Sequence, residues 1–502
     1  MCSSGCANGR PAMSIGVSAD APRTVVGAGR VTRVVFPEPD VTPLTTQALV
    51  PVLIFAAVVV VVLVVAVVLA RWIVRQDGPT PTRWAAAAGV LVCVALLGLA
   101  ALVVLLVTAD QPSNAALARV STIHPPFRPL FDPAVPPSGF PRLRTTSRAG
   151  MQPGTVLITT STTPRPTATT VIHPPFLAEV DKATGALVKV QRMYAMASMF
   201  QPEPDGRYSY NVLDRNGSDG AGFHVTHYMT DGRLRVLERF DLDDLEGGDA
   251  DLHDFELLDN GNALLLAYRR RQVDLSSFGG AADAIVYDPI IAERTPDGET
   301  VWLWDGSRHL DLDDVPPANV ERKLQAQPPA VADYAHPNSL ELYDDGDVLL
   351  SVRNYDCVYR IDRPTGDIVW TFGGVNCADN EFDIGGDPYD GFSHQHDATL
   401  LDDGNILLFD NGNLHDPRRS RAVEYAIDEE ARTAELVWSH DDGRYTAYFG
   451  SAERLDNGNT LISWGALHDP LVTEVTPAGD RVFTLSLPPG QRTYRAYQGA
   501  TG

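Results

Sequence analysis

Three histidines and one arginine stand at matching places in a repeated sequence pattern. His253 and His396 each lie four residues before such a repeat, His336 lies six residues before another, and Arg353 ends that same repeat. A neutral imidazole is a good nucleophile near neutral pH, a protonated one can donate to a leaving group, and a guanidinium holds anionic oxygens in a fork. These residue types suit the transfer of a sulfuryl or phosphoryl group through a histidine adduct.

Two asparagines extend this set. Asn338 lies four residues before its repeat, and Asn411 ends its repeat at the place that Arg353 occupies in the previous one. We predict that both contact the substrate. A metal site is an alternative, because clustered histidines also bind zinc or copper. The sequence has no His-x-x-x-His pair or cysteine partner there, and the charge of Arg353 would repel a cation.

The repeats that carry these residues are strand–turn–strand units. They read LLDNGNALLLAY (257–268), LYDDGDVLLSVR (342–353), LLDDGNILLFDN (400–411) and RLDNGNTLISWG (454–465). Each is a β-rich run, a tight turn at Asp-Gly or Asn-Gly, and a second β-rich run. Most are followed by a second hairpin, such as RIDRPTGDIVWTF (360–372) and EVTPAGDRVFTL (474–485). Two hairpins make one four-stranded antiparallel sheet.

Six such units are recognisable, centred near 154–190, 206–240, 253–304, 336–372, 396–440 and 448–486. Repeated four-stranded units of this size are typical of a β-propeller. We therefore predict an all-β, six-bladed propeller, with seven blades as the alternative because 140–250 is the least regular part. The innermost strands of a propeller line its central channel and start at the same mouth, and the second strands return to it. All six residues above are therefore predicted to meet at one mouth.

The motifs around these residues resemble the arylsulfotransferase family, in its bacterial form that uses no nucleotide sulfate donor. The resemblance lies in IVWTFGG (368–374), FSHQHDATLLDDGN (392–405) and LFDNGN (408–413), with support from HPNSLELYDDGDVLLSVRN (336–354) and HDFELLDNGN (253–262). It implies a six-bladed propeller in which His396 is transiently sulfurylated. His253, His336 and Arg353 would bind the sulfate oxygens and assist the leaving phenol.

The resemblance also implies the reaction and its partners. An aryl sulfate would give its sulfuryl group to His396, and a phenolic acceptor would then take it in a ping-pong sequence, with no metal, nucleotide or other cofactor. Two other hypotheses remain open from the residues alone. One is a non-catalytic propeller that acts as a binding or scaffold module. The other is a metal- or Ca²⁺-dependent enzyme, suggested by the acidic stretch DLDDLEGGDADLHD (241–254).

The N-terminal part has two uncharged apolar runs, 48–70 and 85–107, each of 23 residues. As helices they would span about 35 Å, enough for a hydrocarbon core of about 30 Å. We predict a disordered segment 1–45, two transmembrane helices within 46–109, a Pro-rich linker 110–150, a propeller 151–488 and a tail 489–502. Arg71, Arg75 and Arg83 between the runs place that loop in the cytoplasm. The propeller is then extracytoplasmic on a cell membrane, with the lipid bilayer as partner of 46–109.

The charge is strongly negative. The chain carries −24, and residues 1–109 contribute +3 of this from seven Arg and four Asp or Glu, so the remainder carries −27. Only three lysines occur. We interpret this as adaptation of a halophilic protein to salt, with a generally acidic proteome as the alternative, and it excludes nucleic acid as a partner. Cys357 and Cys377 could form a disulfide or remain free thiols.

Overall fold

The computed structural model describes residues 136–163, 173–214, 224–242, 245, 248–325, 331–374 and 376–499. The predicted segment 1–45, the two predicted membrane helices in 46–109 and most of the predicted linker lie outside these residues. Within the described ranges, no helix is long and apolar enough to cross a membrane.

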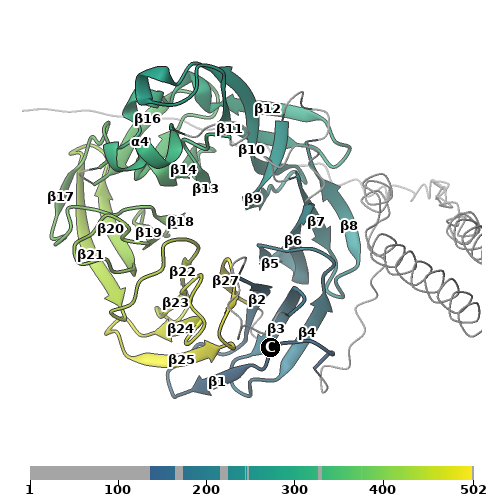
Figure 1. Ribbon diagram of the computed structural model, residues 1–502. Coiled ribbons are helices and arrows are strands. Elements are labelled where there is room, and N and C mark those ends of the chain that lie inside the picture. Colours follow the sequence, from purple (N-terminus) through teal and green to yellow (C-terminus); the bar gives the residue numbers. More distant parts are fainter. Residues whose placement is uncertain are drawn as a thin grey trace, which may run out of the picture. The chain divides into compact units, whose positions relative to one another are not determined.

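Six sheets stand around a common axis like the blades of a propeller (Figure 1). Each has four strands in simple up-and-down order from the axis outward, and three of them gain further strands. The prediction of an all-β fold with six blades is confirmed, and the alternative of seven blades is wrong. The innermost strands β27, β5, β9, β13, β18 and β22 surround the axis (Figure 1).

Blades 1 to 3 come from the first half of the described chain. Blade 1 contains β2 (Thr155–Thr162), β3 (Phe176–Asp181) and β4 (Leu187–Arg192), with the late strands β26 (Gln491–Arg492) and β27 (Ala496–Gln498) paired to β2. Blade 2 contains β5 (Phe200–Glu203), β6 (Arg207–Asp214), β7 (His224–Thr230) and β8 (Val236–Phe240). Blade 3 contains β9 (Gly248–Leu257), β10 (Ala263–Val273), β11 (Ala284–Arg294) and β12 (Thr300–Asp305).

Blades 4 to 6 complete the ring. Blade 4 contains β13 (Pro337–Leu342), β14 (Val348–Val352), β15 (Cys357–Ile361) and β16 (Ile368–Gly373). Blade 5 contains β18 (His396–Leu400), β19 (Ile406–Asp410), β20 (Arg421–Asp428) and β21 (Thr433–Asp441), with β17 (Asp383–Gly385) on its outer edge. Blade 6 contains β22 (Ser451–Arg454), β23 (Thr460–Ser463), β24 (Val472–Val475) and β25 (Arg481–Ser486), with β1 (Arg144–Ser147) on its outer edge.

Segments from both sides of the predicted propeller range close the ring. β1 lies in the range predicted as a linker, and it pairs with β25 of blade 6. β26 and β27 lie in the range predicted as a tail, and both pair with β2 of blade 1. The sheets therefore extend over Arg144–Gln498 rather than 151–488, because the chain must cover edges that a ring of local hairpins leaves exposed.

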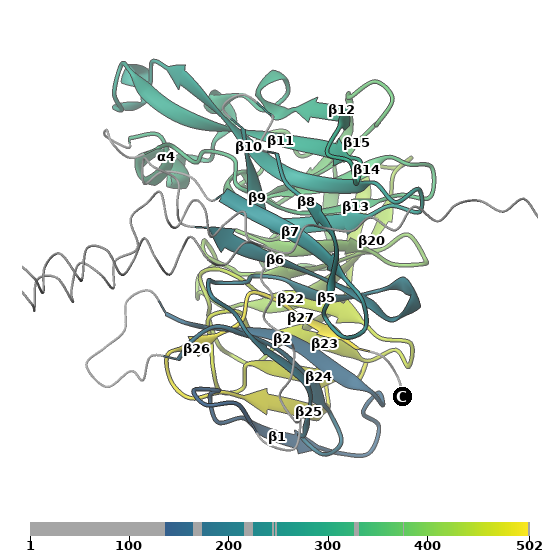
Figure 2. The same ribbon diagram turned by 90° about the vertical axis from the view of Figure 1, so that its right-hand side faces the viewer.

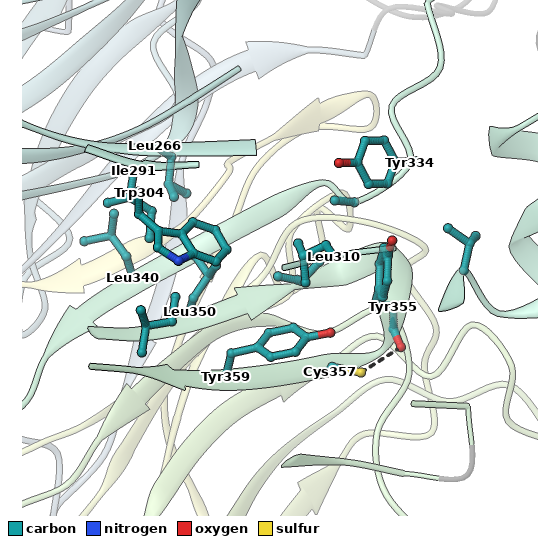
Figure 3. Packing of buried hydrophobic residues seen from close by; sticks show 14 of the residues in the cluster. Leu266, Ile291, Trp304, Leu310, Tyr334, Leu340, Leu350, Tyr355, Cys357 and Tyr359 are labelled. Carbon is teal, nitrogen blue, oxygen red and sulfur yellow. Dashed lines mark hydrogen bonds between the residues drawn. The ribbon is translucent and has the colours of Figure 1, made fainter. Parts of the chain in front are cut away.

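The turns and the core follow from the sequence pattern. The glycines of the four aligned repeats, Gly261, Gly346, Gly404 and Gly458, all have positive φ between 83° and 92° at the hairpin turns, where a side chain would be strained. Apolar faces of neighbouring blades pack against each other. The largest such cluster, between blades 3 and 4, includes Leu266, Ile291, Trp304, Leu350 and Tyr355 (Figure 3). Burying each such side chain contributes roughly 1.5–3 kcal/mol.

One covalent link joins the outer part of blade 4. Cys357 at the start of β15 and Cys377 beyond β16 form a disulfide, with their Cα atoms 5.4 Å apart. Of the two possibilities that the sequence left open, the disulfide is the one that the structure contains.

Side chains on the innermost strands also tie blades 3, 4, 5, 6 and 1 to one another in that order. They accept hydrogen bonds from main-chain N–H groups of the following innermost strand: Asp254 from Leu340, Ser339 from Ala398, Asp397 from Ala452, Ser451 from Ala496, Glu341 from Leu400 and Glu453 from Gln498. These donor–acceptor distances are 2.6–3.2 Å. The ring is therefore joined around its axis by hydrogen bonds as well as by packing between blades.

An insertion between β12 and β13 forms three short helices: η3 (Gly306–Arg308), η4 (Leu312–Asp314) and α4 (Pro317–Lys323). α4 begins with proline, which suits the first turn because its missing N–H needs no partner there. The helix lies at one face of the ring (Figure 2). Two further short helices, η1 (Pro204–Gly206) and η2 (Ser276–Phe278), lie in connections within blades 2 and 3, and η5 (Arg353–Tyr355) follows β14.

Candidate active site

The structure brings the three predicted histidines together. The rings of His253 and His336 meet edge to face with centroids 4.5 Å apart. The ring of Tyr494 meets two of the histidines: its centroid lies 5.6 Å from that of His253 and 6.3 Å from that of His396. Arg353 belongs to the same group, because its main-chain N–H donates to the carbonyl of His336 at 3.1 Å. These residues come from blades 3, 4 and 5, as the repeat register predicted.

Each of the three strands that carry the site is bulged where the site residues lie. The register shifts between Ala250 and Phe255 in β9, between Pro337 and Ser339 in β13, and between His396 and Thr399 in β18. The corresponding ladders of blades 2 and 6 are regular. A bulge bends the strand and re-aims its side chains. The three bulges therefore turn residues of neighbouring blades toward one another.

His396 is held as a neutral imidazole. Its Nδ1–H donates to the side-chain Oδ1 of Asn411 at 2.6 Å, and its Nε2 accepts the main-chain N–H of Phe449 at 3.2 Å. The residue is 1% exposed. Burial lowers the pKa of His396 well below its usual value, and the nearby Arg353 lowers it further. The proton therefore stays on Nδ1, and the lone pair stays on Nε2.

His253 and His336 differ from His396 because each has a carboxylate on Nδ1. Asp251 pairs with His253, and Asp333 pairs with His336. Burial lowers the pKa of His336 to about 4, although Asp333 acts in the opposite direction. The side chain of His336 is 20% exposed, so it is the most open of the three histidines. Neither Nε2 atom has a hydrogen-bond partner among the described residues, so both can meet a ligand.

The guanidinium of Arg353 is held by neighbours from two segments. Its Nη1 donates to Oδ1 of Asn354 at 2.8 Å, and its Nη2 donates to the carbonyl of Ala447 at 2.9 Å. The amide of Asn354 in turn donates to the carbonyl of Asp333 at 2.9 Å. Arg353 and the carboxylate partner of His336 are therefore held by the same asparagine.

The insertion before blade 4 supports the site. Asn319 of α4 donates from its amide to the carbonyl of Asn354 at 2.9 Å, and its Oδ1 lies 3.1 Å from Nε2 of His394. His394 is 3% exposed, and its Nδ1 lies 3.0 Å from Oδ1 of Asp356. Burial lowers the pKa of both His336 and His394, and the charge of Lys323 at the end of α4 lowers each of them further. Lys323 is therefore a positive charge that acts on both histidines.

The two predicted substrate-binding asparagines lie near the site, and their amide atoms bond other protein groups except for Oδ1 of Asn338. Asn411 accepts from His396 and donates to the carbonyls of Thr446 and Phe449, both at 3.0 Å. Asn338 is fully buried and donates to the carbonyl of Gln395 at 2.7 Å. Substrate contact by these two asparagines stays a prediction. The amide of Asn411 already bonds the imidazole of His396 and main-chain carbonyls, and the amide of Asn338 bonds a main-chain carbonyl.

The acidic stretch that suggested a metal-dependent enzyme has other partners where it is described. Asp251 pairs with His253, and Asp254 pairs with Arg495 at 3.2 Å. In the described part of the chain, no three His, Cys, Asp or Glu side chains are arranged to hold a metal ion.

A match to a family model shows which protein family this chain belongs to. The model described as Arylsulfotransferase (ASST) matches residues 227–483, just over half of the chain. The chain belongs to the arylsulfotransferase family. The matched range contains all three histidines, Arg353 and both asparagines, and it ends before the segment that closes the ring. No curated protein matches the chain.

Solved structures are more distant from this arylsulfotransferase family member. A protein of unknown function from Bacteroides caccae is 12% identical at a TM-score of 0.42, covering 69% of this chain and 100% of its own. The periplasmic gluconolactonase PpgL of Pseudomonas aeruginosa is 14% identical at a TM-score of 0.39, with coverages of 69% and 100%. Virginiamycin B lyase from Staphylococcus aureus is 10% identical at a TM-score of 0.29, with coverages of 69% and 74%.

Several residues of this arylsulfotransferase-type site were not found from the sequence. Asp251 and Asp333 lie two and three residues before their histidines, so a search for nearby acidic residues could have found them. Phe449, Tyr494 and Arg495 lie far from the motifs, and nothing in the sequence marks them. They reach the site through the connection between blades 5 and 6 and through the segment that closes the ring.

Proposed function

We propose that this protein transfers a sulfuryl group from an aryl sulfate to a phenolic acceptor through a covalent adduct on Nε2 of His396. The observation that carries this proposal is the difference between the Nδ1 partners. A neutral amide faces His396, whereas carboxylates face His253 and His336. An amide partner keeps an imidazole neutral with its lone pair on Nε2, and a carboxylate partner lets an imidazole carry a second proton as an ion pair.

In the first step, Nε2 of His396 attacks the sulfur of the aryl sulfate. An N–S bond forms, the S–O bond to the aryl group breaks, and the electron pair leaves with the phenolate oxygen. The imidazolium of His253 or His336 gives its Nε2 proton to that oxygen. Arg353 holds the sulfuryl oxygens with its permanent charge. The N–H of Phe449, which meets Nε2 at 3.2 Å before the reaction, is close enough to turn to a sulfuryl oxygen.

In the second step, the acceptor phenol takes the place of the product. The imidazole that gave up its proton now removes the phenol proton, and the phenolate oxygen attacks sulfur. The O–S bond forms, the N–S bond breaks, and the electron pair returns to Nε2 of His396. Protons balance over the cycle, because the same imidazole gives one and takes one. Neither a nucleotide nor a metal is needed for this sequence, which is ping-pong.

The local charges favour an anionic donor although the chain as a whole is acidic. Arg353 and Lys323 are permanent cations at the site, and the burial of the histidines strengthens every charge interaction there. A bound sulfate ester adds a negative charge beside His336, which stabilises its imidazolium form. We therefore expect substrate binding to raise the pKa of His336 from its value of about 4 toward neutrality.

The test is detection of the adduct itself. The full chain is mixed with 4-nitrophenyl sulfate without an acceptor, quenched in alkali, and digested for mass spectrometry. We expect one equivalent of released nitrophenol and a sulfuryl group on the peptide that contains His396. A His396→Gln variant should give neither, whereas a His440→Gln variant of a histidine outside the site should behave like the wild type. Absence of both signals in the wild type would favour a non-catalytic binding module instead.

We also propose that residues 46–109 anchor the protein in a membrane, with the propeller outside the cytoplasm. The support for this is the pair of uncharged 23-residue runs with arginines between them. Thiol labelling of a single cysteine introduced at Thr80 and of another at Ser161, in intact cells, distinguishes the two sides. Protection of the first and labelling of the second is expected, and the reverse pattern would contradict the proposed orientation.

A further inference from the structure

Arg495 joins the three bulged strands from the opposite side of the ring. It lies one residue before β27, in the segment that closes blade 1, and it is 4% exposed. Its Nη2 donates to the main-chain carbonyl of Asn338 at 2.6 Å, and both terminal nitrogens reach Oδ2 of Asp254, at 3.2 and 3.3 Å. Its Nη1 also lies 3.0 Å from Oδ1 of Asp397.

These three partners have one property in common. Asp254 directly follows His253, Asp397 directly follows His396, and Asn338 is two residues beyond His336. Each lies within the bulge of its own strand. The guanidinium of Arg495 therefore bonds one residue in the bulge of each of the strands β9, β13 and β18.

The same carboxylates also fix the bulges to neighbouring blades. Asp254 accepts the N–H of Leu340 at 3.0 Å, and Asp397 accepts the N–H of Ala452 at 3.0 Å. The backbone of Asp397 has a φ of 57°, a left-handed conformation that is strained for a residue with a side chain. A strained backbone persists only where its surroundings hold it, and Arg495 is one of the groups that hold this one.

We propose that Arg495 is a positioning residue of the active site, which sets the mutual distances of His253, His336 and His396 by clamping the three bulges. This inference rests on the proposed sulfuryl transfer, and it adds a residue outside both the sequence motifs and the range that the family model matches. The planar fork of arginine is required, because three acceptors from three strands must be reached at once. A lysine ammonium is a single point charge and cannot reach all three.

The experiment compares the Arg495→Lys variant with a Lys182→Met variant of the full chain. Lys182 is a matched control, because it is also a buried cation at the ring closure. It pairs with Glu474 at 2.7 Å and donates to Gln498 of β27 at 2.6 Å, but it contacts none of the bulges. Both variants should unfold at a lower temperature than the wild type. Only Arg495→Lys should change the site.

For Arg495→Lys we expect kcat for aryl sulfate turnover to fall by about 100-fold with little change in KM, since misplacement by about 1 Å has this effect on catalysis. The ¹⁵N and ¹H imidazole signals of His253, His336 and His396 should shift together. For Lys182→Met, kcat and these signals should stay as in the wild type. If Arg495→Lys does not fold, Asp254→Asn, which removes one arm of the clamp, takes its place with a smaller expected loss.

The two readouts separate the two proposals. Full activity of a folded Arg495→Lys, or an equal loss of kcat in Lys182→Met, would overturn the positioning role. If the wild type has no turnover, the proposed sulfuryl transfer fails, and the imidazole signals alone then decide. A joint shift in Arg495→Lys without a shift in Lys182→Met supports the clamp, and unchanged signals in both reject it.

Discussion

The partner of each Nδ1 atom divides the histidines into two kinds. His396 faces the uncharged amide of Asn411, while His253 faces Asp251 and His336 faces Asp333. Three imidazoles of the same intrinsic pKa can therefore perform two tasks at one pH. In the proposed mechanism the neighbours, and not the histidines themselves, assign the nucleophile and the proton carriers.

The first prediction exchanges the neutral partner for a charged one. In Asn411→Asp, the new carboxylate should raise the pKa of His396, the usual effect of an opposite charge in contact. More of His396 is then protonated at low pH, and a protonated imidazole cannot attack. In the wild type His396 stays neutral between pH 6 and 8, so its titration should not lower the rate of nitrophenol release in this range. In the variant, the rate should fall as the pH falls. An unchanged profile in the variant would count against His396 as the nucleophile.

The second prediction concerns the proton given to the leaving phenol. Asp251→Asn removes the carboxylate that lets His253 carry this proton, so the loss should depend on the leaving group. We expect a fall of about 100-fold with phenyl sulfate, within the range for a lost general acid, and a much smaller fall with 4-nitrophenyl sulfate, whose phenolate leaves without protonation. Asp333→Asn, measured in parallel, shows whether His336 shares the task. Equal losses with both donors would exclude His253 as the acid.

The positions of the histidines could be predicted from the sequence because they depend on repeat register. Counting residues back from an Asp-Gly or Asn-Gly turn locates a strand start in any blade. The task of Asn411 could not be predicted in this way, because it depends on the bulge in β18 that begins at His396, the partner of Asn411. Arg495 could not be predicted either, since its partners lie 98 or more residues away in sequence.

At the scale of elements, the connection between β21 and β22 covers the site. The main-chain N–H of Phe449 donates to Nε2 of His396, and the carbonyl of Ala447 accepts from Nη2 of Arg353. Phe449 has a φ of 68°, and Gly450 follows with a φ of 114°. A Cβ at Gly450 would lie 2.3 Å from the ring of Phe409, which leaves no room for a side chain. The shape of this connection therefore depends on Gly450.

The third prediction uses this glycine. Gly450→Ala should shift the connection, move the Phe449 N–H away from His396, and lower kcat by about tenfold or more, as expected for the loss of one preorganised donor. Gly404→Ala is the matched control, because Gly404 also has a positive φ of 85° but has open space around its Cβ position. The control should lose about 1 kcal/mol of folding free energy and keep its kcat. Equal kcat in the two variants would show that the connection does not affect catalysis.

The hairpins of the four aligned repeats could be predicted because an Asp-Gly or Asn-Gly pair in the sequence marks each turn. α4, β1 and β27 were not, since each acquires its place only through distant contacts. α4 is a seven-residue helix in a segment without a clear apolar period, and it is held through Asn319 and its partners. β1 and β27 have three or four residues each, too few for a strand signal without the edges that they cover.

At the scale of the whole molecule, three innermost strands carry a partly buried glutamate: β9, β13 and β22. Burial raises the pKa of Glu256, Glu341 and Glu453 to about 8 each, and neighbouring carboxylates act in the same direction. At pH 5 to 7 these groups are therefore mostly protonated in the folded ring. In the unfolded chain the same groups have their ordinary value of 4.5 and are ionised over this range.

The fourth prediction is that folding stability falls as the pH rises from about 5 to 8. At these three glutamates the folded protein binds more protons than the unfolded chain over this window, so raising the pH through it favours unfolding. The contribution of these glutamates is complete below their unfolded value of 4.5 and is lost as the pH passes about 8. We expect the melting temperature, measured at constant ionic strength, to fall by at least about 2 °C, the shift that 1 kcal/mol causes in a large domain.

A variant identifies the groups responsible. Glu341→Gln cannot ionise, so it should flatten the dependence of melting temperature on pH. Glu299→Gln, a change at an exposed turn residue, should leave the dependence as in the wild type. A melting temperature that rises from pH 5 to 8 in the wild type would show that these glutamates do not control stability.

The closure of blade 1 by β27 has a consequence for the order of events when the protein is made. A ribosome that has reached residue 490 has already synthesised His253, His336, Arg353 and His396, and five blades can form from chain that has emerged. Arg495 and its clamp are still missing at that moment. Under the proposed clamp, the unfinished protein holds every motif residue but lacks the group that positions them, and we expect sulfuryl transfer to begin only after the ring has closed.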